Sequence, residues 1–219
     1  YLPVPVIGAP SGLAIGGGFE VLAHCDALVA HTNSTFGLVE AGVGLLPAGG
    51  GVKQTYLRWF NKTQDWDEAA WKCWMQIGYG KIGTSPDMSA RYCYFLPDKD
   101  RQVMNKDRIF EKACALNLNM QEAYTPPEIP TFKLANPTMR EKMHAFMENG
   151  VSQGIFTPHN LTTAMAIADV IVAKDGERQS ITEQDMFARE RANFIKLAKT
   201  PQTLSRIASL LDSGTAERN

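Results

Sequence analysis

The chain has 219 residues, a formal net charge of −1 and a hydrophobic content of 44%. This length and composition are sufficient for one domain with a sizeable core, extended by a helical region. The near-zero charge, without a basic run, argues against nucleic acid or an anionic membrane as the main partner. No apolar run is long enough to span a bilayer and no signal peptide is visible, so we expect a cytoplasmic protein.

The four cysteines show neither CxxC pairing nor the spacing of a metal site. They are Cys25, Cys73, Cys93 and Cys114. We therefore interpret them as reduced structural thiols and expect no metal in this chain.

Residues 6–51 hold two glycine clusters, each close to an acidic residue in apolar surroundings. Gly16-Gly17-Gly18 comes just before Glu20, and Gly49-Gly50-Gly51 comes after Glu40. Glycine lets the backbone approach a ligand closely. This pairing of glycines with acids makes the stretch the candidate active-site region.

The first glycine cluster follows a predicted buried strand at residues 4–7 and begins a predicted helix at residues 17–24. The N–H groups of Gly17, Gly18 and Phe19 would then have no intrahelical acceptor. Such groups, at the positive end of a helix, stabilise an oxygen that gains negative charge during a reaction. We expect the second cluster to open a helix at residues 49–60 with free N–H groups of the same kind.

Downstream of the first cluster the pattern changes from mixed α/β to helical. Up to residue 123 it predicts strands at 26–31, 35–38 and 103–104, and helices at 65–77, 86–94 and 107–123. Residues 124–137 contain four of the twelve prolines and predict an extended linker. Helices are then predicted at 138–149, 157–174 and 201–211, and another begins at a capping box at Ser180–Glu183 and runs to 199. The helix at 157–174 starts with Thr157-Pro158. The predicted organisation is an α/β part at 1–123, a linker at 124–137 and a helical region at 138–219.

Three segments of the N-terminal stretch resemble the crotonase (enoyl-CoA hydratase/isomerase) superfamily. They are Ser11–Glu20, Phe36–Glu40 and Gly44–Gly50. The resemblance implies a crotonase-like ββα spiral of the α/β class, followed by a C-terminal helical region. Because Tyr1 leads directly into a strand pattern without an initiator Met, we expect the crotonase core to be incomplete at its N-terminus.

Three later segments resemble the C-terminal hydratase region of fused 3-hydroxyacyl-CoA dehydrogenases. They are Asn105–Arg108, Tyr124–Pro127 and Ser213–Asn219. This resemblance implies that the parent protein is a multifunctional enzyme of fatty-acid β-oxidation. Its partners would be an acyl-CoA substrate and an upstream dehydrogenase domain of the same polypeptide. Whether the protein also forms a homo-oligomer stays open. Coenzyme A would come with the substrate, no cofactor is expected in this chain, and NAD is expected only in the missing dehydrogenase region.

The resemblance also implies roles for individual residues in adding water to a 2-enoyl thioester. Glu20 would be the base toward water, Glu40 would supply the proton to C2, and the Gly17 N–H would be one oxyanion donor. The residues expected near the water and the substrate are Gly16, Gly18, Pro47, Ala48 and Gly49. The family takes the second oxyanion donor from a loop upstream of this segment, so we expect the chain alone to be inactive.

Two other functions stay open. A Δ3-Δ2-enoyl-CoA isomerase needs only the acid at Glu40, and a non-catalytic acyl-CoA-binding or assembly domain needs neither acid. The simplest structural interpretation of Glu20 is an acid stabilised by the helix dipole, and that of Glu40 is a solvated loop acid.

Other chemically capable residues favour structural roles. Ser11 is not in a GxSxG elbow, and the glycine clusters lack the GK[ST] of a P-loop. We expect His24 and Cys25 to pack in the core. The tryptophans are expected to be core or subunit contacts rather than a cofactor site; they are Trp59, Trp66, Trp71 and Trp74. Arg189, Arg191 and Lys196 could meet CoA phosphates, but a solvated helix face is the better interpretation.

Overall fold

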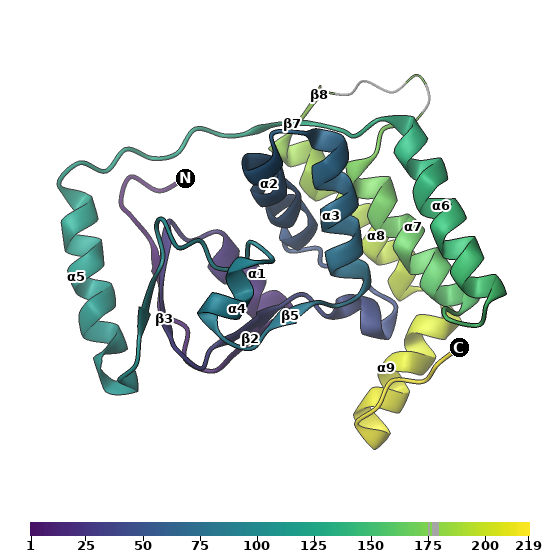
Figure 1. Cartoon of the computed structure of the whole chain (residues 1–219), viewed down its shortest axis with the longest axis horizontal. Helices are drawn as coiled ribbons and strands as arrows, with labels where there is room; N and C mark the ends of the chain where they lie inside the picture. The colour runs from purple at the N-terminus through teal and green to yellow at the C-terminus, as the bar shows by residue number, and fades with distance from the viewer. Residues whose placement is uncertain (175, 177–179) are drawn as a thin grey trace. The chain divides into compact units, whose positions relative to one another are not determined.

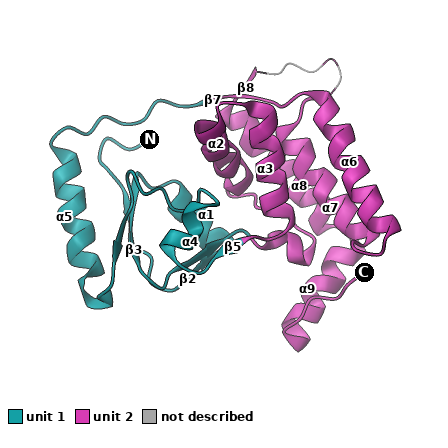
Figure 2. Ribbon diagram, in the orientation of Figure 1, with its two compact units in different colours: residues 1–38, 82–130 teal, residues 39–81, 131–219 magenta. Residues whose placement is uncertain are grey.

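The computed structural model describes residues 1–174, 176 and 180–219 (Figure 1). The chain forms two compact units, each built from two separate segments (Figure 2). Unit 1 comprises Tyr1–Leu38 and Ile82–Pro130, and unit 2 comprises Val39–Lys81 and Thr131–Asn219. In the described part of the chain, no helix combines the length and the apolar character needed to cross a membrane.

These compact units differ from the ranges that the sequence predicts. Residues 39–81 pack with the helices after Thr131, whereas the sequence pattern placed them in the part that ends at 123. The predicted ranges divide the chain in another way, into the family core at 1–123, a linker at 124–137 and a helical region at 138–219. This division stays a prediction.

Unit 1 is an α/β arrangement of two small sheets. One sheet has the order β1-β3-β6, with β1 (Ile7–Gly8), β3 (Ala27–His31) and β6 (Arg101–Val103) all parallel. In the other, β2 (Leu13–Ile15) is parallel to β4 (Thr35–Gly37), and β5 (Ile82–Gly83) is antiparallel to β4. The helical elements are α1 (Gly17–Ala23), α4 (Pro86–Ala90), the 3-10 helix η2 (Lys106–Arg108) and α5 (Ile109–Gln121).

The core of unit 1 forms where α5 lies on the parallel sheet. Val29 of β3 is buried against Ile109 and Ala113 of α5, with Ile7 and Val103 at the edge of this cluster. The apolar run of β3 is buried along its length, as expected for the central strand of a parallel sheet. The α/β class predicted from sequence is confirmed.

The first strand lies further along the chain than predicted. It covers Ile7–Gly8 rather than residues 4–7, and Val4 and Val6 are exposed. Pro3 and Pro5 have no N–H to donate to a strand ladder, which explains the late start. The Val6 N–H instead binds the Asp26 carboxylate at 2.7 Å.

Unit 2 is mainly helical. Its helices are η1 (Glu40–Val43), α2 (Gly51–Thr63), α3 (Trp66–Gly78), α6 (Pro137–Ser152), α7 (Pro158–Ile171), α8 (Glu183–Ala198) and α9 (Pro201–Ser213). The apolar α7 is the most deeply buried of these and packs against α2, α3, α6 and α8. Strands β7 (Thr131–Lys133) and β8 (Ser180–Thr182) form an antiparallel pair beside α8.

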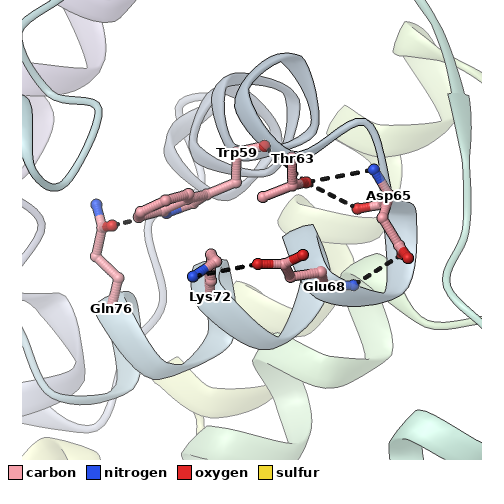
Figure 3. A network of polar contacts seen from close by, with 6 residues as sticks. All are labelled: Trp59, Thr63, Asp65, Glu68, Lys72 and Gln76. Carbon is pink, nitrogen blue, oxygen red and sulfur yellow. Dashed lines mark hydrogen bonds and ion pairs between the residues drawn. The ribbon is translucent and has the colours of Figure 1, made fainter.

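Helices α2 and α3 form a hairpin that is held by polar contacts within the pair (Figure 3). The Trp59 indole N–H donates to Gln76 Oε1 at 2.8 Å, which links the two helices. At the turn, Thr63 Oγ1 donates to Asp65 O at 3.1 Å, and Asp65 Oδ1 caps α3 by accepting from Glu68 N at 3.0 Å. This local capping explains why the predicted boundaries of α3 are correct to one residue.

The segment predicted as an extended linker includes strand β7, in which Phe132 is buried and pairs with Ile181 of β8. One prediction in the C-terminal half is wrong in detail. The capping box is formed by Thr182 and Asp185 rather than by Ser180 and Glu183. Ser180 is part of the β8 ladder, so the helix begins two residues later than the motif indicated.

Candidate functional site

Glu20 lies in the first turn of α1, and its side chain is buried, with 8% of its surface exposed. A Cβ atom built on Gly17 would lie 4.0 Å from Glu20 Oε2, so the carboxylate sits beside the Gly17 backbone. The three-residue spacing causes this, because residues three apart on a helix lie on the same face. The turn thus joins a carboxylate and a backbone amide in one small region.

Gly16 gives this turn its shape. Its φ of 57° and ψ of −131° belong to a region that only glycine adopts without strain. The Gly16 N–H donates to Gly37 O at 2.8 Å, which ties the turn to strand β4. A glycine at this position is therefore a requirement of the backbone.

The N–H groups of this turn are partly used by the protein. Phe19 N and Glu20 N both donate to Gly16 O, at 2.9 and 3.0 Å. The expectation that the Phe19 N–H is free is therefore wrong, because the chain turns tightly enough at Gly16 to capture it. Gly17 and Gly18 are exposed, and their N–H groups have no acceptor among the described residues.

An aromatic cluster fixes α1 in unit 1. The buried Phe19 ring packs edge-on against Tyr94 with centroids 4.6 Å apart, and against Phe36 at 6.1 Å. Tyr94 Oη in turn accepts a hydrogen bond from Leu38 N at 3.2 Å. These partners were missed by the sequence analysis, since nothing local links Tyr94 to the glycine cluster.

The expected packing of the residues after α1 is not found. His24 is exposed rather than in the core, and its Nδ1 atom lies 2.7 Å from Glu20 O. Cys25 is half-buried, with its thiol directed to Val21 O at 3.6 Å. His24 thus caps the short helix that carries Glu20, because α1 ends at Ala23.

Glu40 is the first residue of η1 in unit 2, and it is half-buried. It is therefore not the solvated loop acid of the simplest structural interpretation. The turn after it closes when Leu45 N donates to Glu40 O at 3.0 Å, with Gly44 at a φ of 81°. The backbone around Glu40 is thus fixed at both ends of η1.

Two distant residues hold the Gly44 turn. Thr203 Oγ1 donates to Gly44 O at 2.9 Å, and His159 Nε2 lies 2.8 Å from the same Thr203 oxygen. Because the single hydroxyl proton of Thr203 goes to Gly44, His159 donates from Nε2. Burial and the nearby Arg206 hold the pKa of His159 below its usual value, which favours this neutral form.

Pro47, Ala48 and Gly49 lead from η1 into α2, where Gly50 is the N-cap with a φ of 94°. The expected free N–H groups are not found here. Gly50 N donates to Glu190 Oε2 at 2.8 Å and Lys53 N to Glu190 Oε1 at 2.6 Å. Glu190 comes from α8 and is fully buried, so the positive end of α2 is filled by the protein's own carboxylate.

The basic residues of α8 have different surroundings. Arg189 donates to the carbonyl oxygens of Asp169, Val170 and Val172, at 2.6, 2.9 and 3.0 Å, and so caps the end of α7. This corrects the interpretation of Arg189 as part of a solvated face. Arg191 and Lys196 are exposed, as that interpretation expects.

The predicted site residues thus form two groups. Gly16, Gly17, Gly18 and Glu20 share one turn of unit 1, and Glu40, Pro47, Ala48 and Gly49 share one segment of unit 2. The convergence of the Glu20 and Glu40 carboxylates on one substrate stays a prediction. Glu190, His159 and Thr203 were missed as supports of the second group. The contacts of Glu190 and Thr203 with this group span more than a hundred residues of chain, and His159 acts through Thr203, 44 residues away.

Comparisons with known proteins agree with the resemblance seen in the sequence. Residues 1–63, which include both acids and both glycine clusters, match the family model described as enoyl-CoA hydratase/isomerase. The "Fatty acid oxidation complex subunit alpha" of Idiomarina loihiensis is 54% identical over 51 residues, which are 23% of this chain and 7% of that protein. The resemblance to the crotonase superfamily is confirmed.

Similarity over the whole chain is weaker. The "Probable 3-hydroxyacyl-CoA dehydrogenase" of Bacillus subtilis is 28% identical over 221 residues, and the chain spans only 28% of its length. Among solved structures, the carnitinyl-CoA hydratase of Mycobacterium avium matches with a TM-score of 0.58 at 18% identity. That match covers 99% of this chain and 63% of the other, and it shows the fold alone.

Proposed function

Since the chain has the crotonase fold and its first 63 residues match the enoyl-CoA hydratase/isomerase family, we propose that it carries the catalytic acids of an enoyl-CoA hydratase. The reaction is syn addition of water to the double bond of a 2-enoyl-CoA. The observation that carries the proposal is the first turn of α1. There a buried carboxylate lies beside Gly17, whose exposed N–H has no acceptor among the described residues.

In this proposal, negative charge that develops on the thioester oxygen is stabilised by the Gly17 N–H. Glu20 removes a proton from the attacking water, whose oxygen bonds to C3. Glu40 gives a proton to C2 and helps to hold the same water. Gly16 and Gly18 shape the oxyanion side of the site, and Pro47, Ala48 and Gly49 form its water side.

We further propose that the hydratase works within a multifunctional enzyme of fatty-acid β-oxidation. The names of the Bacillus and Idiomarina relatives, and the small share of them that the chain spans, support this context. A 3-hydroxyacyl-CoA dehydrogenase domain of the same polypeptide would bind NAD and oxidise the hydrated product. The proposal places the enzyme in the cytoplasm and assigns the second oxyanion donor to that longer protein, so that the 219-residue chain alone is inactive.

The test is replacement of each acid in the full-length protein. Glu20→Gln and Glu40→Gln should each lower kcat/KM for hydration of crotonyl-CoA by roughly 10²–10⁴-fold, because each removes one proton-transfer group. Glu122→Gln, at an exposed acid after α5, is the matched control and should leave hydration unchanged.

A second substrate separates hydratase from isomerase. With a 3-enoyl-CoA, an isomerase would keep most of its activity in Glu20→Gln and lose it in Glu40→Gln. Near-normal hydration by Glu20→Gln would contradict the proposed role of Glu20.

A further inference from the structure

The segment that follows η1 is held at both of its ends by side chains from helices α8 and α9. It runs from Gly44, at the end of η1, to Gly50, the N-cap of α2. Gly44 and Gly50 are buried, whereas Ala48 is half-buried and Gly49 is exposed. We call residues 44–50 the clamped segment, because its middle is accessible while its ends are fixed by the protein.

Thr203 of α9 holds the first end of the clamped segment. Its hydroxyl donates to Gly44 O at 2.9 Å, and a Cβ atom added to Gly44 would lie only 2.7 Å from the same Thr203 oxygen. The added atom would also lie 2.6 Å from His159 Nε2, so the two side chains cover Gly44 closely. Leu45 N donates to Glu40 O at 3.0 Å. The first end therefore fixes the short helix that carries Glu40.

Glu190 of α8 holds the second end. It is fully buried, and its two carboxylate oxygens accept from Gly50 N at 2.8 Å and from Lys53 N at 2.6 Å. Hydrogen bonds to a charged acceptor are about twice as strong as neutral ones. The buried Lys53 ammonium pairs with Glu183 at 2.6 Å and lies 4.4 Å from the centre of the Phe187 ring. Three side chains of α8 thus fix the first turn of α2.

On the premise of the proposed function, we infer that Glu190 is a positioning residue for the addition of water. The proposal gives the water side of the site to Pro47–Gly49, and Glu190 holds the helix start that directly follows these residues. Thr203 holds the chain between these residues and Glu40. Loss of the Glu190 carboxylate should therefore displace the water side and leave Glu40 in place.

Two reactions separate the water side from the acid. Hydration of crotonyl-CoA needs both. Exchange of the C2 protons of butanoyl-CoA in D₂O needs only the acid and the oxyanion donor, because this saturated thioester has no double bond to hydrate. Glu40 would remove a proton from C2, the negative charge would move to the thioester oxygen, and the carboxyl group, after exchange with solvent, would return a deuteron to C2.

Glu190→Gln in the full-length protein is the main test. Glutamine keeps the size of the side chain but has one acceptor oxygen where glutamate has two, so an N–H group at the start of α2 loses its acceptor. Because a displacement of about 1 Å can cost about 10² in rate, kcat for hydration should fall roughly 10–100-fold. KM and the rate of C2 exchange should stay within about threefold of the wild type, since Glu40 keeps its position.

Gln76→Leu is the matched control. It also removes a buried hydrogen-bond acceptor next to α2, since Gln76 Oε1 accepts from the Trp59 indole at 2.8 Å. Gln76 belongs to α3 rather than to the clamped segment. Both rates should therefore stay within about twofold of the wild type, even though the protein loses stability.

Thr203 provides a second pair of variants, which tests the first end and does not depend on whether Glu190→Gln folds. Thr203→Val keeps the shape but cannot donate to Gly44 O, so Glu40 loses its support. Hydration and C2 exchange should then both fall roughly tenfold. Thr203→Ser keeps the hydroxyl and should restore both rates. A general loss of stability would not give opposite patterns at the two ends.

Amide hydrogen exchange gives a readout that does not need catalysis. Glu190→Gln should speed exchange in peptides that cover residues 44–53 and leave peptides of α3 unchanged. If the wild type hydrates no enoyl-CoA but this exchange pattern holds, the proposed function fails and the fixation of the clamped segment by Glu190 stands. If hydration occurs and Glu190→Gln lowers it no more than Gln76→Leu does, or lowers C2 exchange equally, the inference is overturned.

Discussion

The two glycine-rich helix starts look alike in sequence but differ in what fills them. At α1, the carboxylate comes from within the first turn, and the exposed N–H groups of Gly17 and Gly18 have no acceptor in the described part of the chain. At α2, the Glu190 carboxylate arrives from α8 and takes the N–H groups of Gly50 and Lys53. A run of glycines before a helix therefore does not by itself show that the helix end can receive a ligand.

Because of this difference, the α1 turn can bind a ligand, whereas the α2 turn can only support the neighbouring protein segment. Backbone N–H groups that bind a buried protein carboxylate are unavailable for a substrate oxygen. At α2 they instead fix the direction of the segment Pro47–Gly49, which connects η1 to the helix. Of these two turns, the α1 turn is the one that our proposal assigns to a developing oxyanion.

The largest effect is expected from removal of the Glu190 carboxylate. Glu190→Ala leaves two buried N–H groups of α2 unpaired, and each costs about 1–3 kcal/mol, so the free energy of unfolding should fall by roughly 2–6 kcal/mol. Urea denaturation measures this. Glu148→Ala, an exposed acid on α6, is the control and should change stability by less than about 0.5 kcal/mol. Equal effects of the two replacements would show that α2 does not depend on Glu190.

The α1 turn should respond to a different change, because its shape comes from local backbone geometry. Gly16→Ala introduces a side chain where φ is 57° and ψ is −131°, which costs about 1–3 kcal/mol of stability. Gly18→Ala is the matched control, since its φ is ordinary and a Cβ atom there meets nothing within 4 Å. It should be neutral or slightly stabilising in the same urea experiment. A neutral Gly16→Ala would mean that the turn is not constrained at this residue.

Features that depend on residues close together in the sequence could be predicted, whereas features that depend on contacts between distant residues could not. Helix α7 was predicted because its cap, Thr157, lies next to the helix that it stabilises, and α3 because its apolar residues recur at helical spacing. Strands β2 and β5 were not predicted, because three and two residues give too short a pattern, whereas the three-residue β4 was predicted at 35–38. The proximity of Gly17 and Glu20 follows from their three-residue spacing on a helix, so it was predictable.

The support of the second group of site residues was not predictable, for a physical reason. Glu190 reaches Lys53 across 137 positions of sequence, and Thr203 reaches Gly44 across 159. A lone acid or threonine on an amphipathic helix carries no signal of such a contact. Only the packed arrangement of α8 and α9 against unit 2's first helices reveals it.

The smallest expected effect concerns pH and the turn that follows Glu40. His159 is buried and neutral, and its pKa lies below the unfolded value of about 6.5 because of burial and, secondarily, Arg206. As the pH falls below about 6.5, the unfolded state takes up a proton that the folded state resists, so stability is present above this pH and is lost on acidification. Urea denaturation at pH 7.5 and 5.5 should therefore show a larger loss of stability for the wild type than for His159→Gln. The remaining titratable groups are shared by both proteins and cancel in the comparison. An identical pH dependence in the two would show that His159 does not hold the Gly44 turn in its neutral form, and the support of Glu40 would then depend on Thr203 alone.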